Sequence, residues 1–382
     1  MTTVINTALL AQRAGDVLMN TYGRQPVAFA SGEGSWLTDF NGRRYLDCLS
    51  GLAVVAVGHA NPRVAAAVSA QMSRLVHVSN LFYTEPMIEL AERLGALSGL
   101  PKVFFSNDGA TANEAAIKLA RRYGQLNGGA DRHQVISLSD SFHGRTLATL
   151  AATGQPEKQA VFAPLPPGFV QVPVGDPAAL QAAMGPNTAA VMVETLQGEG
   201  GVRPLDPGYL RDVRRLCTAN GSLLIIDDVQ AGIGRTGGWF SWHQLGIAPD
   251  IATVAKALAN GLPIGACLAS ETAAVFRPGD HATTFGGGPV VCAAALAVLD
   301  EIEERGLLAN CRARGEQLGQ LLSEVDGVSE VRGRGLLLAA VLNEANATEV
   351  TRAALDEGLV VNAVRTDTVR FAPPLTITEE EV

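Results

Sequence analysis

The chain has 382 residues, of which 47% are hydrophobic and 18% are charged, and its formal net charge is −9. This length allows two or three domains of about 100–200 residues each, and the apolar fraction excludes intrinsic disorder. The acidic balance and the lack of a Lys/Arg block argue against a nucleic-acid partner. No apolar run reaches the ~18 residues that cross a bilayer, so we expect no membrane segment.

Cysteine and histidine usage argues against disulfides and metal sites. The five cysteines are odd in number, scattered and without a C-x-x-C pair, which is typical of reduced, buried thiols. The six histidines are dispersed and form no H-E-x-x-H motif. Residues 1–4 do not begin a basic segment followed by an apolar one, as a secretion signal would. We therefore expect a cytoplasmic protein without a structural or catalytic metal.

The first part of the chain predicts a helix and a small antiparallel unit. Residues 7–22 have the apolar spacing of an amphipathic helix, and 27–30 and 35–39 are strand candidates. Asn41-Gly42 favours a hairpin turn. From about residue 60, apolar strands alternate with helical segments; we expect strands at 102–106, 134–138, 189–194, 223–227 and 251–254, and helices at 112–123, 207–220 and 290–305.

These strands are apolar throughout and do not alternate with polar residues. Such strands, separated by helices, indicate an α/β fold with a mostly parallel sheet covered on both faces. At the end of the chain, Thr378 and Glu381 have capping-box spacing, so we expect the first turn of a helix that the chain cuts short.

Two residues at the ends of predicted strands could take part in a reaction. Asp227 ends the apolar strand 223–227, at the edge where α/β sheets present ligands, although it could equally be a helix cap. Lys256 follows the strand 251–254 and has apolar neighbours. A lysine in apolar surroundings can lose its proton near neutral pH, as bond formation to a carbonyl carbon requires, but an isolated lysine is more often a solvated charge.

Other polar residues occur at strand ends. Asp108-Gly109-Ala110-Thr111 joins a strand to a helix, where free backbone N–H groups can hold an anion such as phosphate. Arg145, in the loop 141–146, could clamp a carboxylate or be a satisfied loop residue. Thr283 and Thr284 precede a glycine-rich segment, which could instead be a connector. Glu194 and Glu199 could act as paired acid and base groups or be solvated. Neither a dinucleotide-binding nor a P-loop motif occurs in its required context.

The segments described above occur in the order that resembles fold-type I pyridoxal-phosphate (PLP) enzymes. Together they are similar to the class-III aminotransferases of the ornithine and acetylornithine type. The resemblance runs from Gly32 to Pro374. Its most specific segments are Phe142-His143-Gly144-Arg145-Thr146, Gln230-Ala231-Gly232-Ile233-Gly234-Arg235-Thr236-Gly237, Ala255-Lys256-Ala257 and Thr283-Thr284-Phe285-Gly286-Gly287.

The resemblance implies a fold and a reaction. The fold would have a large domain, 59–278, with a mostly parallel sheet flanked by helices, and a smaller α+β domain built from both chain ends, 1–58 and 279–382. The reaction would transfer an amino group from N-acetylornithine to 2-oxoglutarate in a ping-pong cycle of arginine synthesis, catalysed by a homodimer that binds PLP.

The resemblance also assigns roles to residues. Lys256 would bind the cofactor covalently and move a proton, and Asp227 would keep the pyridine nitrogen protonated. The other cofactor-binding residues would be Gly109, Ala110, Phe142, His143, Gln230 and, from the partner subunit, Thr284. The substrate-binding residues would be Arg145, Thr283, Arg370 and Glu199, of which Glu199 would shield an arginine from the first substrate.

Five positions depart from the family pattern, and they bear on cofactor and substrate. Asp108 stands where the family has Ser or Thr, and Thr111 where it has Glu. A carboxylate beside a phosphate is repulsive by ~1 kcal/mol or more, so we expect Asp108 to weaken cofactor binding. Val55 replaces an Asn near the expected substrate pocket, Asp228 replaces a Glu, and Gly288 replaces an Asn.

Three alternatives remain open at this point. One is another class-III activity, on ornithine, succinylornithine, 4-aminobutyrate or an N-acylated diamino acid. The second is an aminomutase, which would keep both nitrogens on one substrate and need no 2-oxoglutarate. The third is a cofactor-free paralogue that serves as a binding partner, which the departures at Asp108 and Thr111 keep open.

Overall fold

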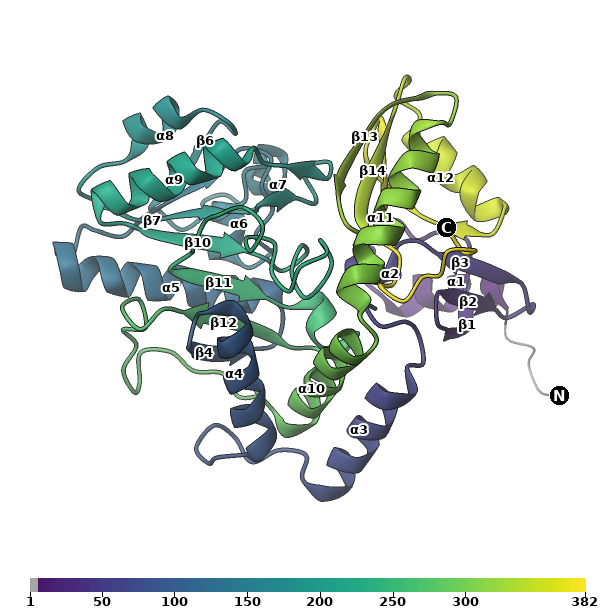
Figure 1. Ribbon diagram of the computed structural model, residues 1–382, viewed down its shortest axis with the longest axis horizontal. Coiled ribbons are helices and arrows are strands. Elements are labelled where there is room, and N and C mark those ends of the chain that lie inside the picture. Colours follow the sequence, from purple (N-terminus) through teal and green to yellow (C-terminus); the bar gives the residue numbers. More distant parts are fainter. Residues whose placement is uncertain (1–5) are drawn as a thin grey trace.

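A seven-stranded sheet forms the centre of the larger lobe of the computed structural model (Figure 1). The structure describes residues 6–382, so the residues inspected for a secretion signal lie outside the described part. From one edge to the other, the strands are β4 (Lys102–Ser106), β12 (Gly265–Ala269), β11 (Ile251–Val254), β10 (Leu223–Asp227), β7 (Thr188–Val193), β5 (Gln134–Leu138) and β6 (Phe169–Val172).

Helices cover both faces of this sheet, as its continuous apolar strands predict. On β10, Ile225 packs into the cluster under α5 (Gly109–Gly128), whereas Leu224 and Ile226 pack into the cluster that includes α9 (Pro207–Asn220). Successive side chains of a strand point to opposite faces, so a strand buried on both sides must be apolar throughout.

The prediction of a mostly parallel α/β sheet is confirmed, with two strands, β6 and β12, that the sequence pattern missed. β12 runs antiparallel to both β11 and β4, while the other paired strands of the sheet run parallel. β12 has the sequence Gly-Ala-Cys-Leu-Ala, and Gly and Ala have low strand propensity, so its pairing depends on tertiary contacts.

The larger lobe contains further helices around the sheet. α10 packs against α3 and α4 at the junction between the lobes. The elements are α3 (Pro62–Arg74), α4 (Glu85–Ser98), α6 (Leu147–Ala152), α7 (Pro156–Ala160), α8 (Pro177–Ala183), the short pair β8 (Leu196–Gln197) and β9 (Arg203–Pro204), the 3-10 turn η1 (Lys256–Ala259) and α10 (Pro289–Glu304).

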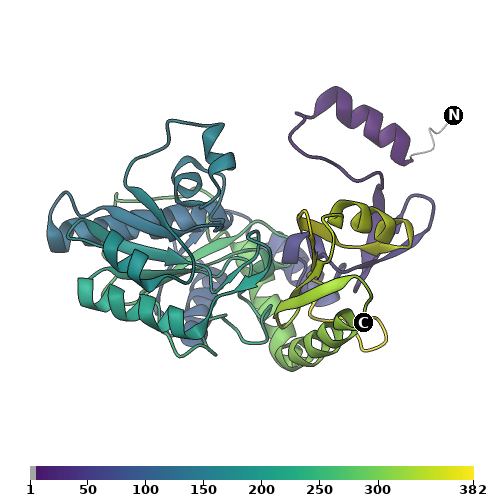
Figure 2. The same cartoon turned by 90° about the horizontal axis from the view of Figure 1, so that it is seen from above.

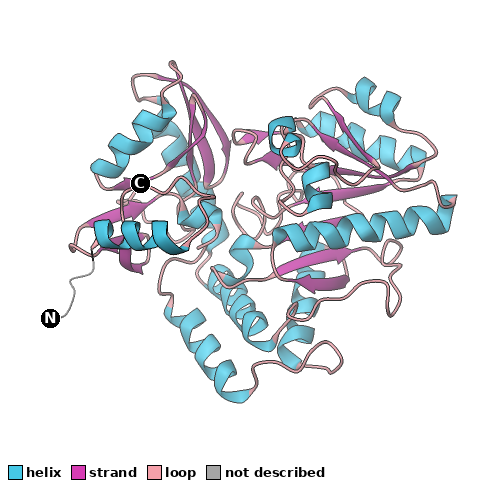
Figure 3. Cartoon of the chain, turned by 180° about the vertical axis from the view of Figure 1, so that it is seen from behind, coloured by secondary structure: helices cyan, strands magenta, loops and turns pink. Residues whose placement is uncertain are grey.

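The smaller lobe is an α+β unit built from both ends of the chain (Figure 3). Its first sheet joins β1 (Phe29–Glu33), β2 (Trp36–Asp39) and β3 (Arg44–Asp47) to β15 (Leu359–Val360), which pairs parallel with β3. Its second sheet has the order β13 (Val328–Arg334), β14 (Leu337–Leu342), β17 (Thr368–Phe371) and β16 (Asn362–Arg365), and its helices are α11 (Leu307–Ser323) and α12 (Ala347–Asp356). The domain boundaries at residues 58 and 278 stay a prediction.

The two chain ends differ from expectation. α1 (Thr7–Val17) is shorter than the expected helix, buries none of its side chains and lies apart from the rest of the molecule (Figure 2). At the other end, Thr378 and Glu381 exchange capping-box hydrogen bonds, but residues 378–382 form turns and no helix.

The sheet places the loops after β4, β5, β7, β10 and β11 at one edge, because these strands all point the same way. The five cysteines are free and buried, as predicted. None of the described helices is long and apolar enough to cross a bilayer.

Candidate active site

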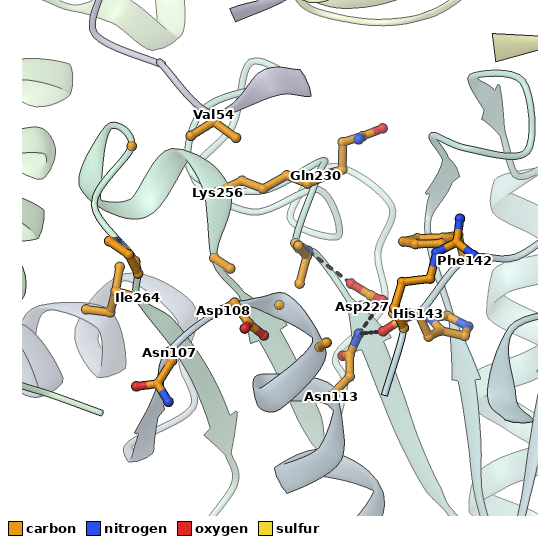
Figure 4. A pocket seen from close by; sticks show the side chains of 18 of the residues that line it. Val54, Asn107, Asp108, Asn113, Phe142, His143, Asp227, Gln230, Lys256 and Ile264 are labelled. Carbon is orange, nitrogen blue, oxygen red and sulfur yellow. Dashed lines mark hydrogen bonds and ion pairs between the residues drawn. The ribbon is translucent and has the colours of Figure 1, made fainter. Parts of the chain in front are cut away.

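A cavity of about 600 Å³ opens at this carboxyl edge of the sheet (Figure 4). The loops that follow β4, β5, β10 and β11 all contribute to its wall. The predicted residues that line it are Gly109, Ala110, Phe142, His143, Arg145, Asp227, Gln230 and Lys256. The fold therefore brings together residues separated by almost 150 positions in the chain.

Lys256 lines this cavity at the end of β11. It follows β11 directly and begins the turn η1 with a φ of 37°, a left-handed conformation that side-chain-bearing residues rarely adopt. Burial lowers the pKa of Lys256 to about 8, with Glu199 opposing part of this shift. The amine can therefore lose its proton near neutral pH, which a nucleophilic lysine requires.

Asp227 lies at the end of β10, where its carboxylate is oriented by three donors. Its Oδ2 accepts from Asn113 Nδ2 at 2.7 Å and lies 2.8 Å from His143 Nδ1, and its Oδ1 accepts from the backbone N–H of Val229 at 3.1 Å. Thr253 in turn donates to Asn113 Oδ1 at 2.6 Å. The carboxylate is 5% exposed, so it is fixed in one orientation where a protonated ring nitrogen could meet it.

The N-terminus of α5 provides the anion subsite. The first N–H groups of a helix have no partner within it, and Gly109 and Ala110 occupy these positions at the cavity wall. Asp108 caps the helix: its Oδ1 accepts from Thr111 N at 2.8 Å and from Thr111 Oγ1 at 3.0 Å. Thr111 Oγ1 also accepts from Asp108 N at 3.0 Å, which completes a capping box.

Phe142 and Arg145 occupy the wall after β5. The guanidinium carbon of Arg145 lies 5.6 Å from the centre of the Phe142 ring, and Arg145 is exposed. Among residues 6–382, no carboxylate lies within ion-pair distance of Arg145, so its donors are available to a ligand. Glu194 is buried and accepts from the backbone N–H of Phe142 at 3.1 Å; burial and Asp227 raise its pKa.

Glu199 and Arg370 form an ion pair in contact with Gln230, a residue of the cavity wall, but neither of the two lines the cavity itself. Arg370 Nη1 donates to Glu199 Oε1 at 2.6 Å and to Gln230 Oε1 at 3.2 Å, and the Arg370 side chain is 1% exposed. Although burial alone would raise the pKa of Glu199, Arg370 and Lys256 lower it to about 2. Glu199 therefore pairs with Arg370 and does not form an acid–base pair with Glu194.

Thr283 and Thr284 lie outside this cavity. They line a separate cavity of about 840 Å³, and Thr284 is exposed. Asn107, which lines the lysine cavity, donates to Thr283 Oγ1 over 3.5 Å, so the two cavities are neighbours. A single chain does not bring Thr284 into the cavity that contains Lys256, so the role expected for Thr284 stays a prediction.

Sequence reasoning missed several residues of the cavity. Asn113 lies among alanines on the buried face of α5, and a lone buried amide in such a helix is the signal that could have identified it. Tyr22 lines the cavity from the segment after α1, for which no pattern gave a signal. Val54, and not the expected Val55, lines the cavity, because the chain turns sharply just before it.

Comparison with known proteins settles the family of the chain. Residues 18–382 match the family model described as aminotransferase class-III. The chain belongs to the class-III aminotransferases. It is thus a PLP-dependent aminotransferase, and its substrates are amino acids and 2-oxo acids.

Class-III relatives match over nearly their whole length. The chain is 51% identical over 371 residues to acetylornithine aminotransferase 1 of Bordetella bronchiseptica, covering 95% of this chain and 94% of the relative. It is 50% identical over 370 residues to acetylornithine aminotransferase of Gloeobacter violaceus, with 96% and 92% covered. The structure is similar to ornithine aminotransferase of Toxoplasma gondii, with a TM-score of 0.95, 31% identity and 99% and 93% of the chains covered.

The residues present fit the cofactor of this family. The cavity supplies an amine with a lowered pKa, an oriented carboxylate and a helix N-terminus for a phosphate. The Phe142 ring adds an aromatic surface to the wall of the same cavity. All four features border one space, which is what a phosphorylated pyridine aldehyde needs.

Proposed function

We propose that the chain transfers the amino group of N-acetylornithine to 2-oxoglutarate, giving N-acetylglutamate 5-semialdehyde and glutamate in arginine synthesis. The support comes from the relatives, which at 50–51% identity are acetylornithine aminotransferases. The observation that carries the proposal is the Glu199–Arg370 ion pair beside Lys256.

This pair lets one pocket accept two different substrates. With Glu199 on it, the charge of Arg370 is neutralised, so the pocket can accept the amine-bearing end of N-acetylornithine, whose reacting carbon carries no carboxylate. A dicarboxylate such as 2-oxoglutarate can replace Glu199 on Arg370, exchanging one charge-assisted hydrogen bond for another. Arg145, whose donors face the cavity, would bind the α-carboxylate or its equivalent.

The catalytic roles of Lys256 and Asp227 follow from their surroundings. PLP, when bound, supplies an electron sink for the charge that develops as a proton leaves the amino substrate. Lys256, which is buried and has a pKa of about 8, is suited to take up and return that proton. Asp227, held by Asn113 and His143, would keep a facing ring nitrogen protonated. The N–H groups of Gly109 and Ala110 would hold the phosphate.

The same proposal includes a homodimer. Leu81, Phe82 and Tyr83 are 86%, 64% and 92% exposed, an unusual group of apolar side chains on a surface. Asn80 donates to the carbonyl oxygens of Thr283 and Gly286, which ties this group to the segment that carries Thr284. A second copy that covers this face would bury the apolar side chains and bring Thr284 to the partner's phosphate subsite.

The proposal also covers the cellular compartment and the domain boundaries. The five buried, free thiols suit a reducing compartment, so we retain the cytoplasm. We also retain 1–58, 59–278 and 279–382 as the domain limits.

The test is an amino-donor panel with 2-oxoglutarate as acceptor. We expect kcat/KM for N-acetylornithine to exceed that for ornithine, succinylornithine or 4-aminobutyrate by about ten-fold or more, a difference of ~1.4 kcal/mol. Preference for another donor would overturn the substrate. Turnover without 2-oxoglutarate would indicate an aminomutase, and the absence of an absorption band with added PLP would indicate a cofactor-free protein.

A further inference from the structure

The loop that carries Glu199 is anchored by two arginines that do not line the cavity. Arg332 Nε donates to the carbonyl oxygen of Gly201 at 2.9 Å. Arg365 Nη2 donates to Asp140 Oδ1 at 2.5 Å and to the carbonyl oxygen of Gly200 at 3.4 Å. These contacts fix the backbone on the C-terminal side of Glu199, at the place where the loop meets the smaller lobe.

The loop has little free space around it. Residues 198–202 are buried apart from Glu199, and Val202 N donates to the carbonyl oxygen of Gly198 at 3.1 Å, which closes a tight turn. A Cβ atom on Gly200 would lie 2.8 Å from the carbonyl oxygen of Asp140, and one on Gly201 would lie 3.1 Å from the Arg332 guanidinium. The position of Glu199 therefore depends on what holds these glycines.

One sheet carries both the partner of Glu199 and the loop's anchors. Arg370 is on β17, whereas Arg332 and Arg365 are on β13 and β16, the two edge strands of the same sheet. The pairing of these strands fixes the three arginines relative to one another. A shift of the loop must break contacts with Arg332 or Arg365 as well as with Arg370.

We propose that Arg332 and Arg365 are positioning residues that set how readily Glu199 leaves Arg370, and thus how well the pocket accepts a dicarboxylate. The inference rests on the proposed function, in which Glu199 must leave Arg370 in one half-reaction and stay in the other. Anchors that hold Glu199 in place favour the substrate that has only one carboxylate. Loosening them favours the substrate with a second carboxylate.

The experiment uses Arg365→Ala and Arg332→Ala in the holoenzyme. Arg203→Ala is the matched control: Arg203 is 52% exposed and reaches the same Asp140 only at 3.9 Å, so it removes the same charge without an anchor. We measure the dissociation constant of glutarate, an unreactive dicarboxylate, by calorimetry, and kcat/KM of each half-reaction by single turnover.

We expect glutarate to bind about five-fold more tightly to both anchor variants than to the wild type. This factor is at the lower end of the affinity changes that one site typically causes at another. The ratio of kcat/KM for glutamate to that for N-acetylornithine should rise by about the same factor. Arg203→Ala should match the wild type, and Arg365→Lys, which keeps a donor for Asp140, should lie closer to the wild type than Arg365→Ala.

Two results would overturn the inference. The first is a glutarate affinity that is unchanged or lower in both anchor variants. The second is an equal fall in kcat/KM of both half-reactions together with a fall in the thermal midpoint, which a purely structural role predicts. If the wild type does not use N-acetylornithine, the proposed substrate is wrong. Glutarate affinity would still report on access to Arg370, so the two failures can be told apart.

Discussion

At the scale of single residues, Asp228 is a carboxyl group whose surroundings do not suit an ionised acid. It is fully buried, its Oδ2 accepts from Ser241 N at 3.1 Å, and its Oδ1 has no partner. Burial raises the pKa of Asp228 to about 7, and Asp227 adds to the effect. The folded protein therefore binds this proton more tightly than the unfolded chain does.

This difference predicts how stability depends on pH. Because the folded pKa lies above the unfolded value, the favourable contribution of protonated Asp228 is present below about pH 4 and is lost as the pH rises through about 7. We predict that Asp228→Asn is more stable than the wild type at pH 8.5, by roughly 1–3 kcal/mol, and gains little at pH 5. Thermal midpoints at the two pH values measure this.

The exposed Asp212, which pairs with Arg215 at the surface, supplies the control: Asp212→Asn should follow the wild type at both pH values. Parallel pH profiles for the wild type and Asp228→Asn would show that Asp228 is not the buried ionisable group that we describe.

The sequence predicted a site residue only where the neighbouring residues in the chain formed a recognisable pattern. Lys256 and Asp227 directly follow or end apolar strands, so position alone suggested them. Asn113 orients Asp227 from a helix more than 100 residues away, and no local pattern encodes that contact. The roles of Thr284 and Arg370 came from the family resemblance, because nothing in their own neighbourhoods indicates a ligand.

At the scale of elements, the N-terminus of α5 changes the meaning of two departures from the family pattern. The family places a hydroxyl at the cap and a carboxylate three residues on, whereas this chain has Asp108 at the cap and Thr111 three residues on. The capping box still forms, with the two side-chain types exchanged. Asp108 and Thr111 therefore compensate for each other in folding, but the carboxylate now lies at the cavity wall.

We predict that Asp108→Ser binds PLP about five-fold more tightly than the wild type, because removing a charge next to a phosphate is worth ~1 kcal/mol. Titration of the apoprotein with PLP, followed by absorbance, measures the dissociation constant. Asp108→Asn, which can still cap the helix, should show a similar gain. Unchanged or weaker binding by both variants would show that this carboxylate does not act on the phosphate.

A left-handed turn near the cavity was not predictable from sequence. In α2 (Ser50–Ala53), the four φ angles lie between 51° and 71°, although only one of these residues is glycine. Asp47 Oδ1 accepts from the N–H groups of Leu49 and Ser50 and so fixes the start of the turn. The turn delivers Val54 to the cavity, whereas the family resemblance points to Val55.

At the scale of the whole molecule, residues 81–83 form an exposed apolar group that no other part of residues 6–382 covers. We predict that Tyr83→Glu shifts the protein from dimer to monomer, because a charge would then have to enter an apolar interface. Light scattering after size exclusion measures the mass, and PLP titration of the same samples should show weaker binding, since Thr284 would be lost from the partner's site.

Val325→Glu is the control, because Val325 is 51% exposed on the smaller lobe and far along the chain from this face. It should remain a dimer. A Tyr83→Glu variant that keeps the dimer mass and the PLP affinity of the wild type would contradict the proposed interface.

The sequence also predicted the architecture well where burial determines it. The apolar strands and both layers of helices follow from hydrophobic pattern, and four of the five strands predicted for the large sheet have the expected bounds. The antiparallel β12 pairs with strands distant in the chain, and α1 buries none of its side chains, so no local pattern could specify where either element lies.

The central claim is that a buried, readily deprotonated Lys256 binds PLP, and reduction of the holoenzyme with borohydride tests it most directly. Peptide mass analysis should then find the reduced cofactor attached to the peptide that contains Lys256, and Lys256→Ala should lack both this adduct and transamination. Cofactor fixed on another lysine, or substantial turnover by Lys256→Ala, would contradict the account.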